Sequence, residues 1–145
     1  MLEIVLTILI GLLGGVSVGL QGPIAGAMSQ RVGSSASSFI VHISGAILSG
    51  LLLAARGGET IQNWRGLPWY MLGSGVFGLI LYLTLTHTLP RLGATTAVTL
   101  IIVGQLVMGM LIDQFGWFGV EVRPIDGWRL AAVVLLLAGG YLMVR

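Results

Sequence analysis

The sequence predicts an all-α integral membrane protein of five transmembrane helices. Only 8% of its 145 residues are charged and 56% are hydrophobic, whereas an ordinary soluble domain has about 25% charged residues. Several apolar stretches follow one another, each long enough to cross a hydrocarbon core of about 30 Å. Because the segments between them are too short to fold by themselves, we expect a single transmembrane domain over residues 1–145.

The helices are expected at about residues 4–20, 36–55, 67–89, 94–112 and 128–144. The first stretch follows Glu3 without the basic lead-in or the small-residue cleavage site of a secretory signal, so we expect it to be retained. Glycine, proline and arginine mark the connections. These are Gly22-Pro23 and Arg31-Val32-Gly33 after the first helix, Gly57-Gly58-Glu59 after the second, Pro90-Arg91 after the third and Arg123-Pro124 before the fifth.

Composition excludes several classes of function. The chain has no cysteine, which rules out disulfides, thiolate nucleophiles and cysteine metal sites. Its pI is near 9.7, but the basic residues are single arginines, so we read them as interface anchors and expect no nucleic-acid partner. Motifs of hydrolases and metalloproteases are missing, and the two histidines lie on different predicted helices. We therefore expect no enzyme activity, no catalytic residue, no metal and no cofactor.

Two segments of the sequence echo one another. Arg31-Val32-Gly33-Ser34-Ser35-Ala36 leads into the second helix much as Arg91-Leu92-Gly93-Ala94-Thr95-Thr96 leads into the fourth. Both fall on the same side of the predicted membrane. Independent use of an interface arginine and small residues at a helix start is favoured over a duplicated hairpin.

The arginines give little orientation preference. One side of the membrane would carry Arg56, Arg65, Arg123 and Arg129, and the other Arg31, Arg91 and Arg145. A bias of four against three lets the chain insert both ways round, and many transporters pair two halves of inverted topology. A single five-helix chain could supply both halves by dimerising. A fixed orientation set by features other than charge is the alternative.

Polar side chains gather on one face of several predicted helices. Polar groups at membrane depth usually face a bundle interior or a wet cavity. For each such residue, a structural polar contact within the protein is an equally good interpretation. The candidate substrate-cavity residues are Gln21, His42, Tyr82, Thr99, Gln105 and Asp113. Small residues instead favour close helix packing. The candidate packing residues are Gly11, Gly15, Gly45, Gly78, Gly109 and Gly139.

The predicted helices carry no central carboxylate of the kind on which proton-driven antiport often depends. Glu3, Glu59, Glu121 and Asp126 lie at or beyond helix ends, and Asp113 lies at the margin of the fourth helix. His42 or Asp113 could therefore carry a proton, or transport could be facilitated diffusion. The fifth helix has nothing polar from residue 131 to 140, which is typical of a packing or lipid-facing helix.

Specific runs of residues carry a family resemblance. They are Gly104-Gln105-Leu106, Ile112-Asp113-Gln114-Phe115-Gly116-Trp117-Phe118-Gly119 with Arg129, Pro68-Trp69-Tyr70, Gly73-Ser74-Gly75-Val76-Phe77-Gly78 and Leu89-Pro90-Arg91-Leu92-Gly93-Ala94. Over essentially its whole length the chain resembles the YdcZ-type five-helix inner-membrane proteins of the drug/metabolite transporter superfamily. The resemblance implies a multi-pass protein of the bacterial inner membrane that exports small metabolites or drugs and forms half of a ten-helix plan.

We therefore expect a secondary transporter that exports a small organic solute between two antiparallel copies of the chain, in contact with membrane lipid. Two alternatives stay open: a non-transporting accessory membrane subunit, and one half of a heterodimeric transporter. Polar faces on three predicted helices favour transport, since a subunit that only packs needs one or two.

Overall fold

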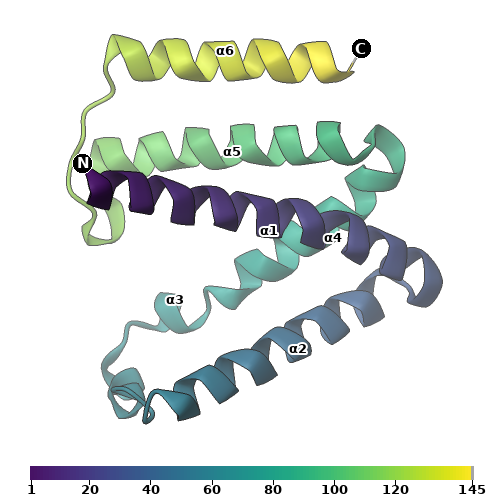
Figure 1. The fold of residues 1–145 in the computed structure, drawn as a ribbon, viewed down its shortest axis with the longest axis vertical. Coiled ribbons are helices and arrows are strands. Elements are labelled where there is room, and N and C mark those ends of the chain that lie inside the picture. Colours follow the sequence, from purple (N-terminus) through teal and green to yellow (C-terminus); the bar gives the residue numbers. More distant parts are fainter. Residues whose placement is uncertain (145) are drawn as a thin grey trace. The chain divides into compact units, whose positions relative to one another are not determined.

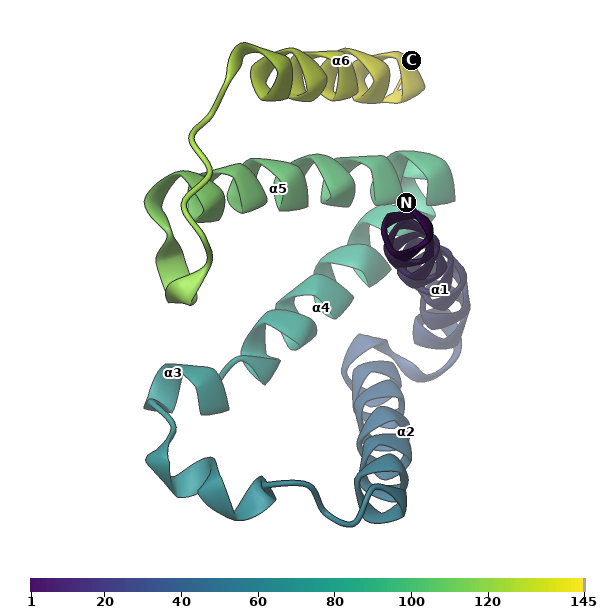
Figure 2. The ribbon, with the colours of Figure 1, turned by 60° about the vertical axis from the view of Figure 1, so that its left-hand side comes forward.

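The computed structural model describes residues 1–144. Arg145, one of the arginines counted above for orientation, lies outside the described residues. The described elements are helices (Figures 1 and 2). They belong to two compact units, Met1–His87 and the residues from Thr88 onward, and the boundary falls within the helix Gly75–Leu92. In chain order they are α1 (Leu2–Val32), α2 (Ser34–Ala55), the 3₁₀ helix η1 (Ile61–Gly66), α3 (Trp69–Leu72), α4 (Gly75–Leu92), α5 (Ala94–Phe115), the 3₁₀ helix η2 (Trp117–Gly119) and α6 (Gly127–Val144).

Four helical stretches are long and apolar enough to cross a membrane: Leu2–Val32, Ser34–Ala55, Trp69–Leu92 and Ala94–Phe115. The last helix, α6, is apolar but shorter; its 18 residues would extend about 27 Å against a hydrocarbon core of about 30 Å. These four stretches confirm the prediction, made from composition, of an all-helical membrane protein. A fifth crossing by α6 stays a prediction.

The first helix is longer than the sequence pattern suggested. We placed its end near residue 20, with Gly22-Pro23 in the connection, but α1 runs through Pro23 to Val32. That placement was wrong because proline was read as a helix terminator. In an apolar helix packed against neighbours, the lost backbone hydrogen bond is tolerated, and here Gly22, Ala25, Gly26 and Ser29 are buried around Pro23.

The two echoing segments adopt the same backbone turn. Gly33 (φ 87°, ψ 154°) and Gly93 (φ 78°, ψ 165°) each separate two helices without an intervening loop. Each glycine N–H donates to the carbonyl four residues earlier, on Ser29 or Leu89, and each glycine carbonyl accepts an N–H from four residues later. Positive φ explains why both positions are glycine. Because α2 and α5 each continue for 22 residues, the echo extends to the length of the helices that follow.

The connection between α5 and α6 is folded back onto the end of α5. Gly116 (φ 63°) caps α5 in the left-handed conformation and donates its N–H to the carbonyl of Ile112. Further along, the N–H of Ile125 donates to Oε1 of Gln114 at 2.7 Å. Asp126 then caps α6, since its Oδ1 accepts the N–H of Arg129 at 2.8 Å. In both views α5 and α6 then lie side by side and antiparallel (Figures 1 and 2).

Very little of the described chain is buried. The buried apolar residues are Ala25, Tyr82, Leu85 and Ala97. Long apolar side chains of α1 are instead largely exposed, for example Ile10 at 70% and Leu13 at 65%. Water does not tolerate a continuous apolar surface of this extent, so lipid or protein must cover it.

The cap at Gly116 provides a test of the α5–α6 turn. An alanine there would hold a left-handed backbone, and its Cβ would lie 2.7 Å from Cγ2 of Val122. We expect Gly116→Ala to lower the free energy of unfolding by about 1–2 kcal/mol, measured by thermal unfolding in detergent. Gly104→Ala, a helical position where an added Cβ meets nothing within 4 Å, is the control. Equal unfolding temperatures for the two variants would contradict the assigned turn.

Candidate functional site

A chain of buried hydroxyl groups joins α1, α2 and α4. Ser37 of α2 is completely buried and its Oγ lies 3.3 Å from the carbonyl oxygen of Ala25 on α1. The same Oγ is hydrogen-bonded to the hydroxyl of Tyr82 on α4. The three residues are 0–5% exposed, so this link lies at the best-packed point of the first unit.

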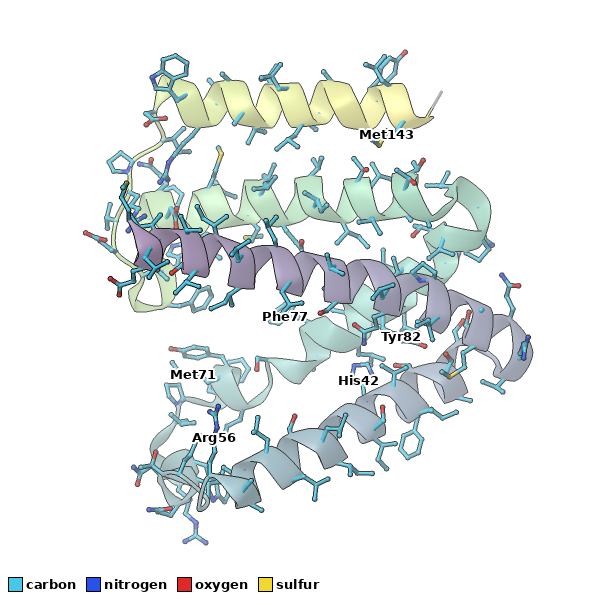
Figure 3. The ribbon with its side chains drawn as sticks, in the orientation of Figure 1. His42, Arg56, Met71, Phe77, Tyr82 and Met143 are labelled. Atoms are coloured by element: carbon cyan, nitrogen blue, oxygen red, sulfur yellow. The ribbon has the colours of Figure 1, made fainter. Side chains whose placement is uncertain are left out.

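His42 lies beside this link, one turn further along α2 (Figure 3). Its ring meets the ring of Tyr82 edge to face, with centroids 5.8 Å apart. Nδ1 lies 2.7 Å from the backbone carbonyl of Ser38 and 3.2 Å from the Ser38 hydroxyl. Nε2 faces Gly78 of α4, where an added Cβ would lie 3.5 Å away. The structure therefore brings together two of the predicted cavity residues, His42 and Tyr82.

Gln21 lies on α1 next to the buried Gly22, and its own side chain is exposed. Gly22 is a close contact between α1 and α4, because an added Cβ would come within 3.0 Å of Cδ2 of Leu85. Gln21 is thus positioned by a tight helix crossing.

In the second unit, the predicted cavity residues of α5 lie in different environments. Thr99 is half-buried against α6, where Gly140 would place an added Cβ 3.3 Å from Cγ2 of Thr99. Its hydroxyl donates to the Thr95 carbonyl at 2.8 Å. Gln105, in contrast, is exposed. Thr96, which the sequence reasoning did not select, ties the helices together by donating to the carbonyl of Met143 at 3.1 Å.

Asp113 forms an ion pair at the end of α5. Its Oδ2 lies 3.1 Å from Nη1 of Arg129 on α6, and both side chains are about one-third exposed. The same Nη1 lies 3.3 Å from the carbonyl of Arg123, whose N–H donates to the Asp113 carbonyl at 2.8 Å. Asp113 therefore closes the α5–α6 turn, and its carboxylate already has a cationic partner.

Most of the predicted packing glycines have no close neighbour among the described residues of their own unit. An added Cβ would meet nothing within 4 Å at Gly11, Gly15, Gly45, Gly109 or Gly139, and Gly78 alone of that set has a contact, with His42. The glycines at which one membrane helix closely approaches another are instead Gly22 and Gly140, which the sequence pattern does not select. The unselected Gly140 neighbours the predicted Gly139, a shift of one residue that changes the helix face.

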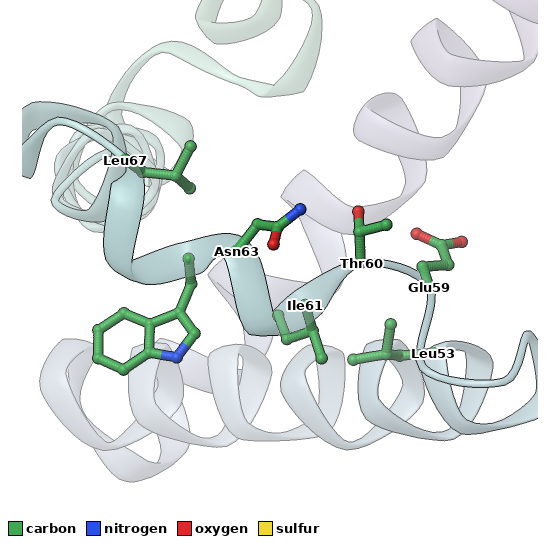
Figure 4. A pocket seen from close by; sticks show the side chains of 7 residues that line it. Leu53, Glu59, Thr60, Ile61, Asn63 and Leu67 are labelled. Carbon is green, nitrogen blue, oxygen red and sulfur yellow. The ribbon is translucent and has the colours of Figure 1, made fainter.

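An open pocket of about 260 Å³ lies between the end of α2 and η1 (Figure 4). It is lined by Leu53, Glu59, Thr60, Ile61, Asn63, Trp64 and Leu67. Glu59 is drawn toward Arg56, with 3.4 Å between Oε1 and Nη1. The pocket therefore belongs to the loop and contains none of the predicted cavity residues. Among the described residues, no group of three His, Asp or Glu is arranged to hold a metal ion.

Ser37 is the principal residue of this site that sequence reasoning missed. The segment Ser34-Ser35-Ala36 is interpreted as small residues at a helix start, and Ser37, which directly follows it, is not singled out by the sequence pattern. A buried hydroxyl can be recognised from such a run only when the helix that crosses it is known, because its partners are 12 and 45 positions away in sequence.

Comparison with known proteins agrees with the membrane character of this fold. The sequence model of the family described as "Putative inner membrane exporter, YdcZ" matches residues 6–142. A relative, "Inner membrane protein YdcZ" of Escherichia coli (strain K12), is 27% identical over 88 residues. The match covers 61% of this chain and 56% of that relative, so it spans just over half of the relative's length. No solved structure matches.

The ion pair at the end of α5 can be tested by removing one charge. We expect Arg129→Gln to lower the free energy of unfolding by about 1 kcal/mol, because it leaves the half-buried Asp113 without its cation while solvent still screens the site. Arg123→Gln is the matched control, since its pair with Glu121 is 62% and 78% exposed. Thermal unfolding in detergent measures both; equal losses would show that the Asp113–Arg129 pair has no special role in the turn.

Proposed function

We propose that this chain, which belongs to the YdcZ family of inner-membrane exporters, is a secondary transporter that moves a small organic metabolite or drug out across the bacterial inner membrane. We further propose that the working unit is a homodimer of two oppositely inserted copies. Each copy contributes helices with polar faces to a solute path, and no cofactor takes part.

The observation that carries the proposal is the exposure of polar side chains on apolar helices. Gln21, His42 and Gln105 lie on α1, α2 and α5, which are each long enough to span the bilayer, and each is exposed in the isolated chain. An amide or imidazole facing hydrocarbon without a hydrogen-bond partner costs several kcal/mol (about 2–7). A wet cavity closed by a second chain gives all three groups partners. A solute path has the same requirement.

The arginine distribution supports the antiparallel arrangement. With nearly equal numbers of arginines on the two sides, insertion has little directional bias. Two copies related by a twofold axis in the membrane plane would present the same polar set to both sides of the membrane. Rocking of one copy against the other would then open the same cavity alternately to each side.

His42 is the stronger of the two candidates for coupling to protons. Asp113 is held by Arg129 at the edge of α5, whereas His42 makes its hydrogen bonds within the described residues through Nδ1. Histidine is the side chain that ordinarily changes charge between about pH 5 and 8. We propose that His42 carries the proton if transport is proton-coupled; a solute that moves by facilitated diffusion would leave it as a polar contact.

Dual insertion is tested by labelling one engineered cysteine, since the native chain has none. The cysteine is introduced by Gln62→Cys, because Gln62 is an exposed residue of η1. A membrane-impermeant thiol reagent should label it from both faces, on intact cells and on inverted vesicles. Adding two or three lysines to residues 57–63 should bias insertion and reduce export, and an oppositely biased partner should restore it.

Labelling from a single face would reject dual topology. A fixed orientation would then favour a heterodimer with a second five-helix chain, or an accessory subunit that packs against a larger partner. In inverted vesicles, export that is restored by co-expressing a second five-helix chain would indicate the heterodimer, and export that is not restored would indicate the accessory subunit.

A further inference from the structure

We propose that Ser37 is a positioning residue for transport: through Tyr82 it holds the His42 imidazole with Nε2 facing α4, as the nitrogen that exchanges a proton or bonds the solute. The transport part of this inference rests on the proposed function. The positioning part rests on the contacts of the first unit alone.

The first step is the direction of the hydrogen bonds at Ser37. A carbonyl can only accept, so the Ser37 hydrogen goes to Ala25, 3.3 Å away. The Ser37 oxygen must then accept from the Tyr82 hydroxyl. Tyr82 is therefore fixed at its tip by Ser37, and Ser37 is fixed in turn by the backbone of α1. Each group is buried, so water does not compete for these bonds.

The second step is the contact between the two rings. With its tip held, the Tyr82 ring stands edge to face against His42, at 5.8 Å and an interplanar angle of 63°. On the other side, Nδ1 of His42 lies 2.7 Å from the carbonyl of Ser38. A carbonyl accepts, so Nδ1 carries the hydrogen and the neutral ring leaves the lone pair on Nε2. Tyr82 is the titratable side chain that faces His42 from α4.

The third step is that the turn itself does not need the Ser37 hydroxyl. The position equivalent to Ser37 after the second glycine turn is Ala97, which is buried to the same extent. Both residues donate their backbone N–H to the turn glycine, at 3.0 and 3.1 Å. An alanine therefore suffices for the same backbone and the same burial. The hydroxyl of Ser37 serves the link to Tyr82.

Nitrogen NMR of histidine tests the positioning without any transport assay. The protein is labelled with ¹⁵N-histidine and held in lipid nanodiscs, and the His42 signals are assigned by their loss in His42→Gln. The wild type should show the tautomer with hydrogen on Nδ1. Ser37→Ala and Tyr82→Phe, which remove the link from opposite ends, should both shift the His42 signals because the Tyr82 ring is no longer held against the imidazole, while Nδ1 keeps its hydrogen bond to the Ser38 carbonyl. Unchanged signals in both variants would overturn the proposal.

Two controls separate positioning from a general packing effect. Ser37→Thr keeps the hydroxyl and should retain the wild-type spectrum. Ser44→Ala removes an exposed hydroxyl of the same helix, which bonds the Val41 carbonyl at 2.9 Å, and should also leave His42 unchanged. A Ser44→Ala spectrum altered as much as that of Ser37→Ala would show that any serine loss in α2 disturbs the ring, contrary to the proposal.

Export by the same variants tests the consequence for transport. Ser37→Ala and Tyr82→Phe should each reduce export about tenfold, and the double variant should export no more slowly than either single variant. Ser37→Thr, which keeps the hydroxyl, should export at the wild-type rate. Shifted His42 signals with normal export would overturn the role in transport and leave the positioning intact. A wild-type protein that exports no solute would refute the proposed function, and the NMR result would still decide the positioning.

Discussion

A polar group inside a bilayer must find its hydrogen-bond partner within protein or in trapped water, and this constraint organises the described part of the chain. Some polar groups meet it within the chain. Ser37 and Tyr82 bond one another, and Thr96 bonds a carbonyl of α6. Others, such as Gln21 and Gln105, are left exposed by the helices that carry them. The first group defines the packing of each unit, and the second defines where a partner or a wet cavity is required.

The apolar helices could be predicted from the sequence because hydropathy depends on a local property, the preference of each side chain for lipid over water. Three structural features could not. The end of α1 could not be predicted from Pro23, because whether a proline ends a helix depends on the helices packed around it. Asp113 shared a predicted face with Gln105, but its partner Arg129 comes 16 residues later on another helix. Ser37 was missed because its partners are distant in sequence.

Some glycines, like some polar residues, have a role that the described structure explains, and others do not. Gly33 and Gly93 are needed for positive φ, and Gly22 and Gly140 allow helices of one chain to approach closely. An added Cβ at Gly11, Gly15, Gly45 or Gly109 would meet no described residue of the same unit within 4 Å. Small residues in membrane helices favour contact between helices. These positions, together with the exposed apolar surface of α1, are consistent with a second chain packed against the first, as the proposed dimer requires.

The proposed solute path requires that the exposed amides face a wet cavity rather than lipid, and the reactivity of a cysteine at position 105 can decide between the two. In reconstituted vesicles, Gln105→Cys should react quickly with a small water-soluble thiol reagent. Ile102→Cys, an exposed apolar position of the same helix, should react slowly because the thiolate does not form in hydrocarbon. Equally slow reaction at both positions would place Gln105 against lipid and contradict the account.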